Sequence, residues 1–294
     1  MLLIIFKKLK NRIVWAKAHI RIFLLKFFGL FSRNKVLCEF NEFTWDMVRL
    51  LPKSYYYIKK NQDILLYLKP NLESLYYFTH NKKVKNIFST SNDINTYSNL
   101  RPNFTKRNWL PPPLKDNFKG FFEFDKPSLI IQNKYTMEFS NEGIFNFFSI
   151  EFLDTFFKNF KKKYQIIYIR PKSNQENYYE DRNDIMPFKD YELINSKHSD
   201  VKTIYDFIDI ERDFNTLQLK LHATSEKHLS VSGGNACLAA YFGGELIIFD
   251  SPNGKGAGRG IWKDDSWLKH LSGSKIIGFN NYNDILNYTL KKWL

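Results

Sequence analysis

Two glycines stand between an apolar run and a helix-like run in the stretch Ser232-Gly233-Gly234-Asn235. Glycine lets the backbone approach a ligand closely and adopt positive φ, and N–H groups at a helix start can hold an anion such as a diphosphate. Asn235 can cap that helix or contact the hydroxyls of a ribose or a sugar. The alternative is a plain strand-to-helix turn with a good cap. The stretch is neither a P-loop nor G-x-G-x-x-G, so neither an NTPase nor a dinucleotide enzyme is favoured.

Basic side chains that follow other apolar runs are a second group that can bind phosphate. Arg170 ends one such run, and a guanidinium fork can form paired hydrogen bonds to a diphosphate. Asn133 and Lys134 follow another run, and Lys255 and Arg259 lie in a glycine-rich loop that can close over a phosphate. The structural alternatives are an ion pair with an acid of the next loop for Arg170 and a solvated loop for the last two.

Carboxylates supply the candidate proton acceptors. Glu138 and Glu142 follow the same apolar run as Lys134 and can reach a cleft, where either can deprotonate a hydroxyl nucleophile. The alternative for each is a solvated surface carboxylate. No Asp-x-Asp triplet and no cluster with metal-ligand spacing occurs, and Cys38 and Cys237 are isolated, so no metal, cofactor or disulfide is predicted.

The segment from residue 126 to the C-terminus has to position these side chains. It alternates short apolar runs with amphipathic ones, around a polar loop at 172–188. Strands are predicted at 128–135, 164–171, 201–208, 228–232, 245–250 and 275–279, and helices at 149–160, 213–226, 235–242 and 282–293. This alternation predicts an α/β fold with a mainly parallel sheet covered on both faces. Ligands bind such sheets beyond the carboxyl ends of the strands, which is where the glycine stretch falls.

The first part of the chain predicts a smaller α/β unit. A short apolar run at 36–40 precedes a helical pattern at 43–60 and a strand at 64–68. Residues 80–120 are rich in polar residues and proline, which predicts a linker or a long surface loop. We therefore expect an N-terminal helix at 1–31, a smaller domain at 32–125 and a ligand-binding domain at 126–294.

Residues 1–31 have the pattern of a basic amphipathic helix. They contain seven Lys or Arg and no acid, and their apolar residues form one stripe at helical spacing. No apolar run is long enough to span a bilayer, so the expected role is to lie on an anionic membrane surface at its cytoplasmic side. The alternative is a helix packed on the protein's own core.

The net charge of the 294-residue chain is +14, with 44% hydrophobic and 17% aromatic residues. This composition predicts a folded protein with an anionic partner: a nucleic acid, an acidic membrane or a phosphorylated small molecule. A lysine surface that is evenly spread and has no partner is the alternative.

The order of motifs resembles a known family. The pattern HLSVSGGNACLAAYFGGELIIF at 228–249 is similar to the donor-binding half of GT-B-type nucleotide-sugar glycosyltransferases. The NKY at 133–135, the IYIRP at 167–171 and the GGN…YFGG at 233–244 also resemble segments in proteins of bacterial surface-polysaccharide gene clusters. The resemblance covers roughly residues 126–294.

The resemblance implies two Rossmann-like halves and transfer of a sugar from a nucleotide sugar to a glycan or lipid-linked acceptor, without a metal. It implies that Glu138 and Glu142 are catalytic candidates. The donor-binding candidates are Asn133, Lys134, Arg170, Ser232, Gly233, Gly234, Asn235, Lys255 and Arg259. No nucleic-acid partner is expected. The alternatives are a non-catalytic basic protein that binds nucleic acid or anionic membrane, with salt-dependent affinity, and an inactive relative of the family.

Overall fold

The chain divides into two units, each with a parallel sheet of its own. The computed structural model describes residues 35–38, 43–68, 71–79, 83–86, 108–137, 143–173, 175, 178, 185–253 and 267–294. Unit 1 is Met1–Pro112 with Tyr179–Arg182, and unit 2 is Pro113–Tyr178 with Asn183–Leu294. The division falls inside the proline run of the predicted linker. The predicted helix at 1–31 lies outside the described residues.

Unit 1 contains a three-stranded parallel sheet and short helices. The strands β1 (Lys35–Cys38), β2 (Ile64–Leu68) and β3 (Lys83–Asn86) lie in the order β1-β2-β3. The predicted helix at 43–60 is α2 (Phe43–Trp45), a π-helical turn (Asp46–Leu50) and α3 (Leu51–Lys59), and a 3-10 helix (Glu73–Thr79) follows β2. Met47, Leu51 and Leu66 are fully buried in its core.

Unit 2 is built on a six-stranded sheet in which every neighbouring pair is parallel. The strands lie in the order β6-β5-β4-β7-β8-β9. Their bounds are β4 (Ser128–Gln132), β5 (Gln165–Ile169), β6 (Lys202–Thr203), β7 (Ser225–Val231), β8 (Glu245–Phe249) and β9 (Lys275–Phe279). This order is consistent with a Rossmann-like fold. The predicted α/β class with a mainly parallel sheet is confirmed.

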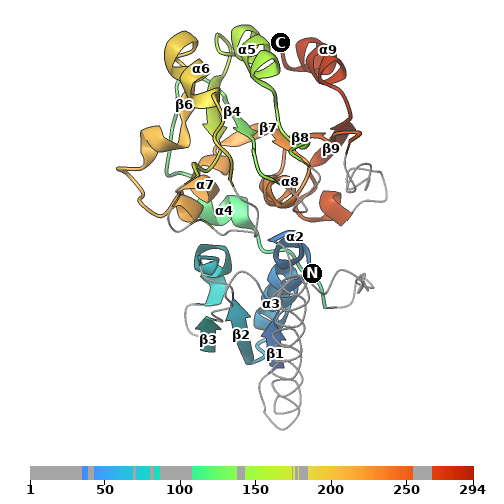
Figure 1. Cartoon of the computed structure of the whole chain (residues 1–294). Coiled ribbons are helices and arrows are strands. Elements are labelled where there is room, and N and C mark those ends of the chain that lie inside the picture. The colour runs from blue at the N-terminus through green and yellow to red at the C-terminus, as the bar shows by residue number, and fades with distance from the viewer. Residues whose placement is uncertain are drawn as a thin grey trace, which may run out of the picture. The chain divides into compact units, whose positions relative to one another are not determined.

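Helices cover both faces of this sheet. They are α4 (Leu114–Phe118), α5 (Ile150–Phe160), α6 (Asp190–Lys197), α7 (Phe214–His222), α8 (Gly234–Ala239) and α9 (Tyr282–Trp293), with 3-10 helices at Ile204–Phe207, Ala240–Phe242 and Trp267–His270. Figure 1 shows α5, α6 and α9 on one face of the sheet and α4, α7 and α8 on the other. Two clusters of buried apolar side chains match these two layers.

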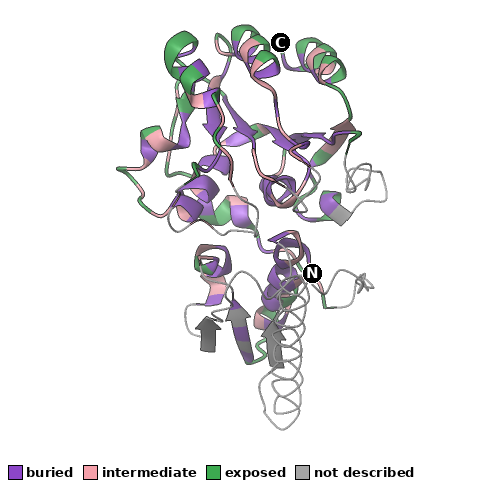
Figure 2. Ribbon diagram, viewed as in Figure 1, coloured by how far each residue is buried: buried purple, intermediate pink, exposed green. Residues whose placement is uncertain are grey.

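The sequence of α5 explains why it forms and which side it buries. The Ser149 hydroxyl accepts a hydrogen bond from the backbone N–H of Phe152 at 3.2 Å and so caps the first turn. Phe152, Phe156 and Phe160 recur at helical spacing and are buried against the sheet. Figure 2 shows the same pattern in unit 2, where the central strands are buried, β9 is only half-buried and the outer faces of the helices are exposed.

Several predicted elements differ from the structure. Only Lys202–Thr203 of the predicted strand at 201–208 is extended, because Thr203 and Asp206 form a capping box that starts a 3-10 helix. The predicted helix at 213–226 ends at His222, and β7 begins three residues later at Ser225.

The predicted linker at 80–120 contains two elements, β3 and α4. α6 also had no predicted counterpart; it is short, and only Asp190, Leu193 and Ile194 are buried, so its amphipathic pattern is weak. Among the helices of the described residues, none combines the length and the apolar character needed to cross a membrane.

Candidate functional site

The sheet of unit 2 has one topological switch point, between β4 and β7. From β4 the chain proceeds outward through β5 to β6, then returns across the sheet to β7 and proceeds the other way to β9. The loops that leave β4 and β7 therefore turn to opposite faces of the sheet, as Figure 1 shows for α5 and α8. In parallel α/β sheets, ligands bind at such a point, outside the carboxyl ends of the strands.

Lys134 and Gly233 meet at this switch point. Lys134 follows β4, Gly233 follows β7, and the pairing of Gln132 with Ser230 keeps the two loops at the same level of the sheet. A Cβ atom built on Gly233 would lie 3.2 Å from Lys134 Nζ. The loop after β4 thus brings the ammonium of Lys134 close to the backbone at Gly233, which follows β7.

Gly233 has φ +137° and ψ −160°, a conformation that L side chains rarely adopt. Its carbonyl accepts the hydrogen bond of Cys237 N at 3.3 Å, so Gly233 is the N-cap of α8 and Gly234 is its first residue. Glycine at 233 therefore supplies both the backbone turn and the space that Lys134 Nζ approaches.

The residues on either side of the glycines are buried. Ser232 extends the pairing of β7 with β8, since its backbone N–H donates to Phe249 O at 2.7 Å. Asn235 is the second residue of α8, and no side chain caps this helix. The prediction that Asn235 caps α8 is wrong, because Gly233 occupies the cap position.

The structure gives Asn133 a structural role in place of the predicted donor contact. Its side chain is fully buried. Its Oδ1 accepts the backbone N–H groups of Lys134 and Phe148, each at 2.9 Å, and its Nδ2 donates to Phe148 O at 3.3 Å and Tyr168 Oη at 2.8 Å. Donors and acceptor are all used inside the protein, so Asn133 holds the loop that carries Lys134 and does not face a ligand.

Arg170 is likewise committed to a partner within the protein. Its side chain is 4% exposed, and its guanidinium forms a paired interaction with Asp190, through Nε to Oδ2 and through Nη2 to Oδ1. Its Nη1 donates to Pro171 O at 3.1 Å. Burial disfavours the charged form of Arg170. The hydrogen bonds to Asp190 and the negative charge of that carboxylate outweigh the effect of burial and raise the pKa of Arg170. The predicted diphosphate contact is corrected, because the planar fork already binds a carboxylate.

The remaining predicted residues lie outside the described part of the chain. They are Glu138, Glu142, Lys255 and Arg259. Their roles stay predictions. In the described residues, no group of three or more His, Cys, Asp and Glu side chains could hold a metal ion.

Two residues that organise the site, Tyr168 and Asp190, were not predicted from the sequence. Tyr168 Oη donates to Asp190 Oδ2 at 2.5 Å, and the Asp190 side chain is fully buried between Tyr168 and Arg170. A signal was present, since an arginine that ends a buried strand requires a carboxylate partner. The polar loop after β5 offered several acids, so the pattern did not single out Asp190.

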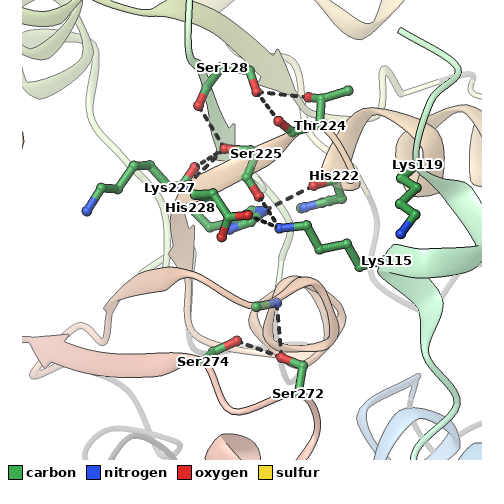
Figure 3. A network of polar contacts seen from close by, with 12 residues as sticks. Lys115, Lys119, Ser128, His222, Thr224, Ser225, Lys227, His228, Ser272 and Ser274 are labelled. Carbon is green, nitrogen blue, oxygen red and sulfur yellow. Dashed lines mark hydrogen bonds and ion pairs between the residues drawn. The ribbon is translucent and has the colours of Figure 1, made fainter. Parts of the chain in front are cut away.

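The opposite edge of the sheet, at the amino ends of the strands, carries a different set of polar contacts. Lys115 extends from α4 to the start of β7, where it binds Ser225 O and the carboxylate of Glu226 (Figure 3). Ser225 Oγ donates to Ser128 O at 2.9 Å, and Ser128 Oγ donates to Thr224 O at 2.8 Å and lies 2.9 Å from Thr224 Oγ1. These contacts join elements of the protein to one another.

Comparison of the chain with protein family models, curated proteins and solved structures gives no match.

Proposed function

We propose that the chain is a metal-independent GT-B-type glycosyltransferase that holds the diphosphate of a nucleotide sugar between Lys134 and the loop at 232–234. The observation that supports this most is the approach of Lys134 Nζ to Gly233 at the switch point of a Rossmann-like sheet. A lysine ammonium binds phosphate as a point charge, and backbone N–H groups in a glycine loop donate hydrogen bonds to it. The resemblance of residues 126–294 to the donor-binding half of this family agrees with that placement.

The chemistry follows from the charge of the leaving group. The acceptor oxygen forms a bond to the anomeric carbon while the bond from that carbon to the phosphate oxygen breaks, and the nucleoside diphosphate leaves with the electron pair. Lys134 and the backbone N–H groups at Gly233 and Gly234 would stabilise that negative charge. The acceptor proton would pass to a carboxylate, for which Glu138 and Glu142 are the candidates.

Unit 1 is the proposed acceptor half. It has its own parallel sheet, and a GT-B enzyme needs two such α/β units. The acceptor would be a glycan or a lipid-linked saccharide in surface polysaccharide assembly.

Residues 1–31, with seven basic residues and an apolar stripe, would bind the chain to the inner face of the membrane. Deletion of these residues is expected to move the protein from the membrane fraction to the supernatant while the rest stays folded, and aggregation of the truncated chain would contradict this role.

The decisive experiment is a thermal-shift screen with UDP, GDP, CDP, ADP, their common sugar conjugates and inorganic pyrophosphate, followed by calorimetry. A ligand that binds the folded state raises its apparent stability by mass action. We expect one nucleoside diphosphate to bind the wild type and to bind Lys134→Met at least roughly tenfold more weakly, as expected for loss of a charged hydrogen bond. Lys158→Met, which removes an equal charge from the exposed side of α5, is the control and should bind normally.

The same screen separates the competing functions. A single-stranded oligonucleotide that binds more tightly than any diphosphate, with a steep salt dependence, would indicate a nucleic-acid-binding protein. Failure of all diphosphates to bind would overturn the proposal. Sugar transfer is expected to survive EDTA, and its loss on chelation with recovery in Mg²⁺ or Mn²⁺ would show that the enzyme uses a metal.

A further inference from the structure

A continuous chain of buried hydrogen bonds runs from Arg170 to the backbone of Lys134. Arg170 binds both carboxylate oxygens of Asp190, and Tyr168 Oη donates to Asp190 Oδ2. Asn133 Nδ2 donates to Tyr168 Oη at 2.8 Å, and Asn133 Oδ1 accepts the N–H of Lys134 at 2.9 Å. Tyr168 lies in β5, Arg170 directly follows β5, Asp190 begins α6 and Asn133 directly follows β4. All four side chains are at most 4% exposed.

The chemistry of each member fixes the orientation of the next. An ionised carboxylate only accepts hydrogen bonds, so Asp190 requires Tyr168 to donate to it. The hydroxyl proton of Tyr168 is then used, and the phenol oxygen can only accept from Asn133 Nδ2. The amide of Asn133 is thereby held with Nδ2 toward Tyr168 and Oδ1 toward the N–H groups of Lys134 and Phe148. A flipped amide would place its NH₂ against two backbone donors.

We propose that this chain, Arg170, Asp190, Tyr168 and Asn133, positions Lys134 for the ligand by fixing the backbone on both sides of the loop that begins at residue 134. The inference rests on the proposed function of the switch-point site. A lysine side chain loses rotational freedom when it binds a phosphate, and a fixed backbone lowers the further entropy cost of ordering it. Tyr168 is a positioning residue in this scheme, since it contacts Asn133 and Asp190 and acts on Lys134 only through them.

Tyr168→Phe tests the inference, because it removes the one oxygen that joins Asp190 to Asn133 and leaves the aromatic ring. Tyr164→Phe is the matched control, since Tyr164 is also a buried tyrosine next to β5 and its hydroxyl donates to Trp293 O at 2.7 Å at the opposite edge of the sheet. Tyr168→Phe loses two buried hydrogen bonds and Tyr164→Phe loses one, and only the hydrogen bonds of Tyr168 lead to Lys134.

The first measurement needs no ligand. Hydrogen exchange of the backbone amides of Lys134 and Phe148 in the full-length protein should become at least roughly fivefold faster in Tyr168→Phe, relative to amides in β8 and β9, as expected when Asn133 loses its hydrogen bond to Tyr168. Tyr164→Phe should leave that ratio unchanged. Equal exchange ratios in the two variants would overturn the inference.

The second measurement is a double-mutant cycle on the affinity for the nucleoside diphosphate that binds the wild type most tightly. Tyr168→Phe should weaken binding about fivefold to tenfold in the wild-type background and have no effect in a Lys134→Met background, because it acts through Lys134. Additive losses would mean that Tyr168 has only a structural role. Absence of any diphosphate binding by the wild type would overturn both the proposed function and this inference. Normal binding that depends on Lys134 but not on Tyr168 would overturn the inference alone.

Discussion

The two ends of the strands in the six-stranded sheet use their polar groups in different ways. We call the side where the strands begin the amino edge and the side where they end the carboxyl edge. At the amino edge, charged side chains bind one another across elements: Glu245 alone accepts from Lys227, Lys275, Tyr288 and Trp293. At the carboxyl edge, a chain of buried hydrogen bonds ends at the backbone N–H of Lys134, whose ammonium lies near Gly233. The contacts at the amino edge join elements of the protein through charged side chains, and those at the carboxyl edge fix the backbone of a lysine at the switch point.

The glycines of the two edges show the same contrast. Gly244, at the amino edge, has φ +68°, and a Cβ atom there would lie 2.2 Å from the backbone oxygen of Glu226. Gly233, at the carboxyl edge, has only the flexible end of a lysine near its missing side chain. One glycine permits two backbone segments to pack, and the other leaves space beside a charged group. Stability and binding are therefore expected to depend on opposite ends of the same strands.

The largest effect is expected from Gly244→Ala. The methyl group would overlap the Glu226 carbonyl, so the backbones of β7 and β8 would have to separate at their amino ends. We expect a loss of more than about 3 kcal/mol in the free energy of unfolding, measured by urea denaturation.

Gly243→Ala is the neighbouring control. Gly243 has φ +76°, but a Cβ atom there meets nothing within 4 Å in the described structure. Its φ of +76° and ψ of −164° lie in a region that is essentially restricted to glycine, so Ala there should cost backbone strain of about 1–3 kcal/mol without the overlap expected at Gly244. Equal losses in the two variants would mean that the contact with Glu226 does not determine the packing of this edge.

Glu245→Gln is expected to give the next largest loss of stability. Burial disfavours the charged form of Glu245, but hydrogen bonds from Lys227, Tyr288, Trp293 and Lys275 lower its pKa to about 2. Because the folded pKa is below that of the unfolded chain, its contribution is complete above about pH 4.5 and is lost as pH falls toward 2. We expect Gln to cost roughly 2–3 kcal/mol at pH 7 by chemical denaturation. The difference between the variant and the wild type should shrink below pH 4, and a constant difference would contradict the assignment.

Two stacked histidines beneath α7 predict a separate loss of stability at mild acid pH. The rings of His222 and His228 lie 5.3 Å apart at an angle of 18°, and both side chains are buried (Figure 3). Burial lowers the pKa of both imidazoles; His228, near the charge of Lys115, has a pKa of about 3, and that of His222 is well below its usual value. The unfolded chain binds protons at these rings below about pH 6.5 and the folded chain does not, so folding weakens as pH falls.

Below about pH 6.5, each of these imidazoles is expected to lower the free energy of unfolding by about 1.4 kcal/mol for each unit by which the pH falls. His222→Phe, which keeps an aromatic ring against Phe242, should reduce the slope of the unfolding free energy between pH 6 and pH 5 by about half. This window lies above the region in which Glu245 titrates. The exposed His270, changed to Gln, is the control. An unchanged slope in the His222 variant would mean that its ring is protonated in the folded state.

The sequence predicted the local elements of unit 2 better than the contacts between them. Apolar runs such as those at 128–132 and 245–249 are fully buried strands, so their pattern alone predicted them. The approach of Lys134 to Gly233 depends on β4 and β7 being neighbours, which no local pattern specifies. Arg170 ends its strand as predicted, but its partner is 20 residues later, in a short helix with little amphipathic signal. The sequence pattern therefore could not show whether Arg170 binds a ligand or the internal carboxylate of Asp190.

The smallest effect on stability is expected from Lys134→Met, and it provides the sharpest test of the comparison between the edges. Lys134 follows β4 at the carboxyl edge and Lys227 lies in β7 at the amino edge, and both lysines are half-buried. Lys227 binds Glu245 at 2.6 Å and lies 5.4 Å from the Trp293 ring centroid, so Lys227→Met should cost about 1 kcal/mol. Lys134→Met should cost less than about 1 kcal/mol, because Asn133 and Tyr168 hold the backbone of its loop and a half-exposed lysine contributes little through its side chain. Conversely, addition of the best-binding nucleoside diphosphate should stabilise wild type and Lys227→Met equally and Lys134→Met much less, as measured by the shift in Tm. A loss of stability in Lys134→Met as large as that in Lys227→Met, with no change in ligand response, would mean that Lys134 is a structural contact and that the two edges do not differ.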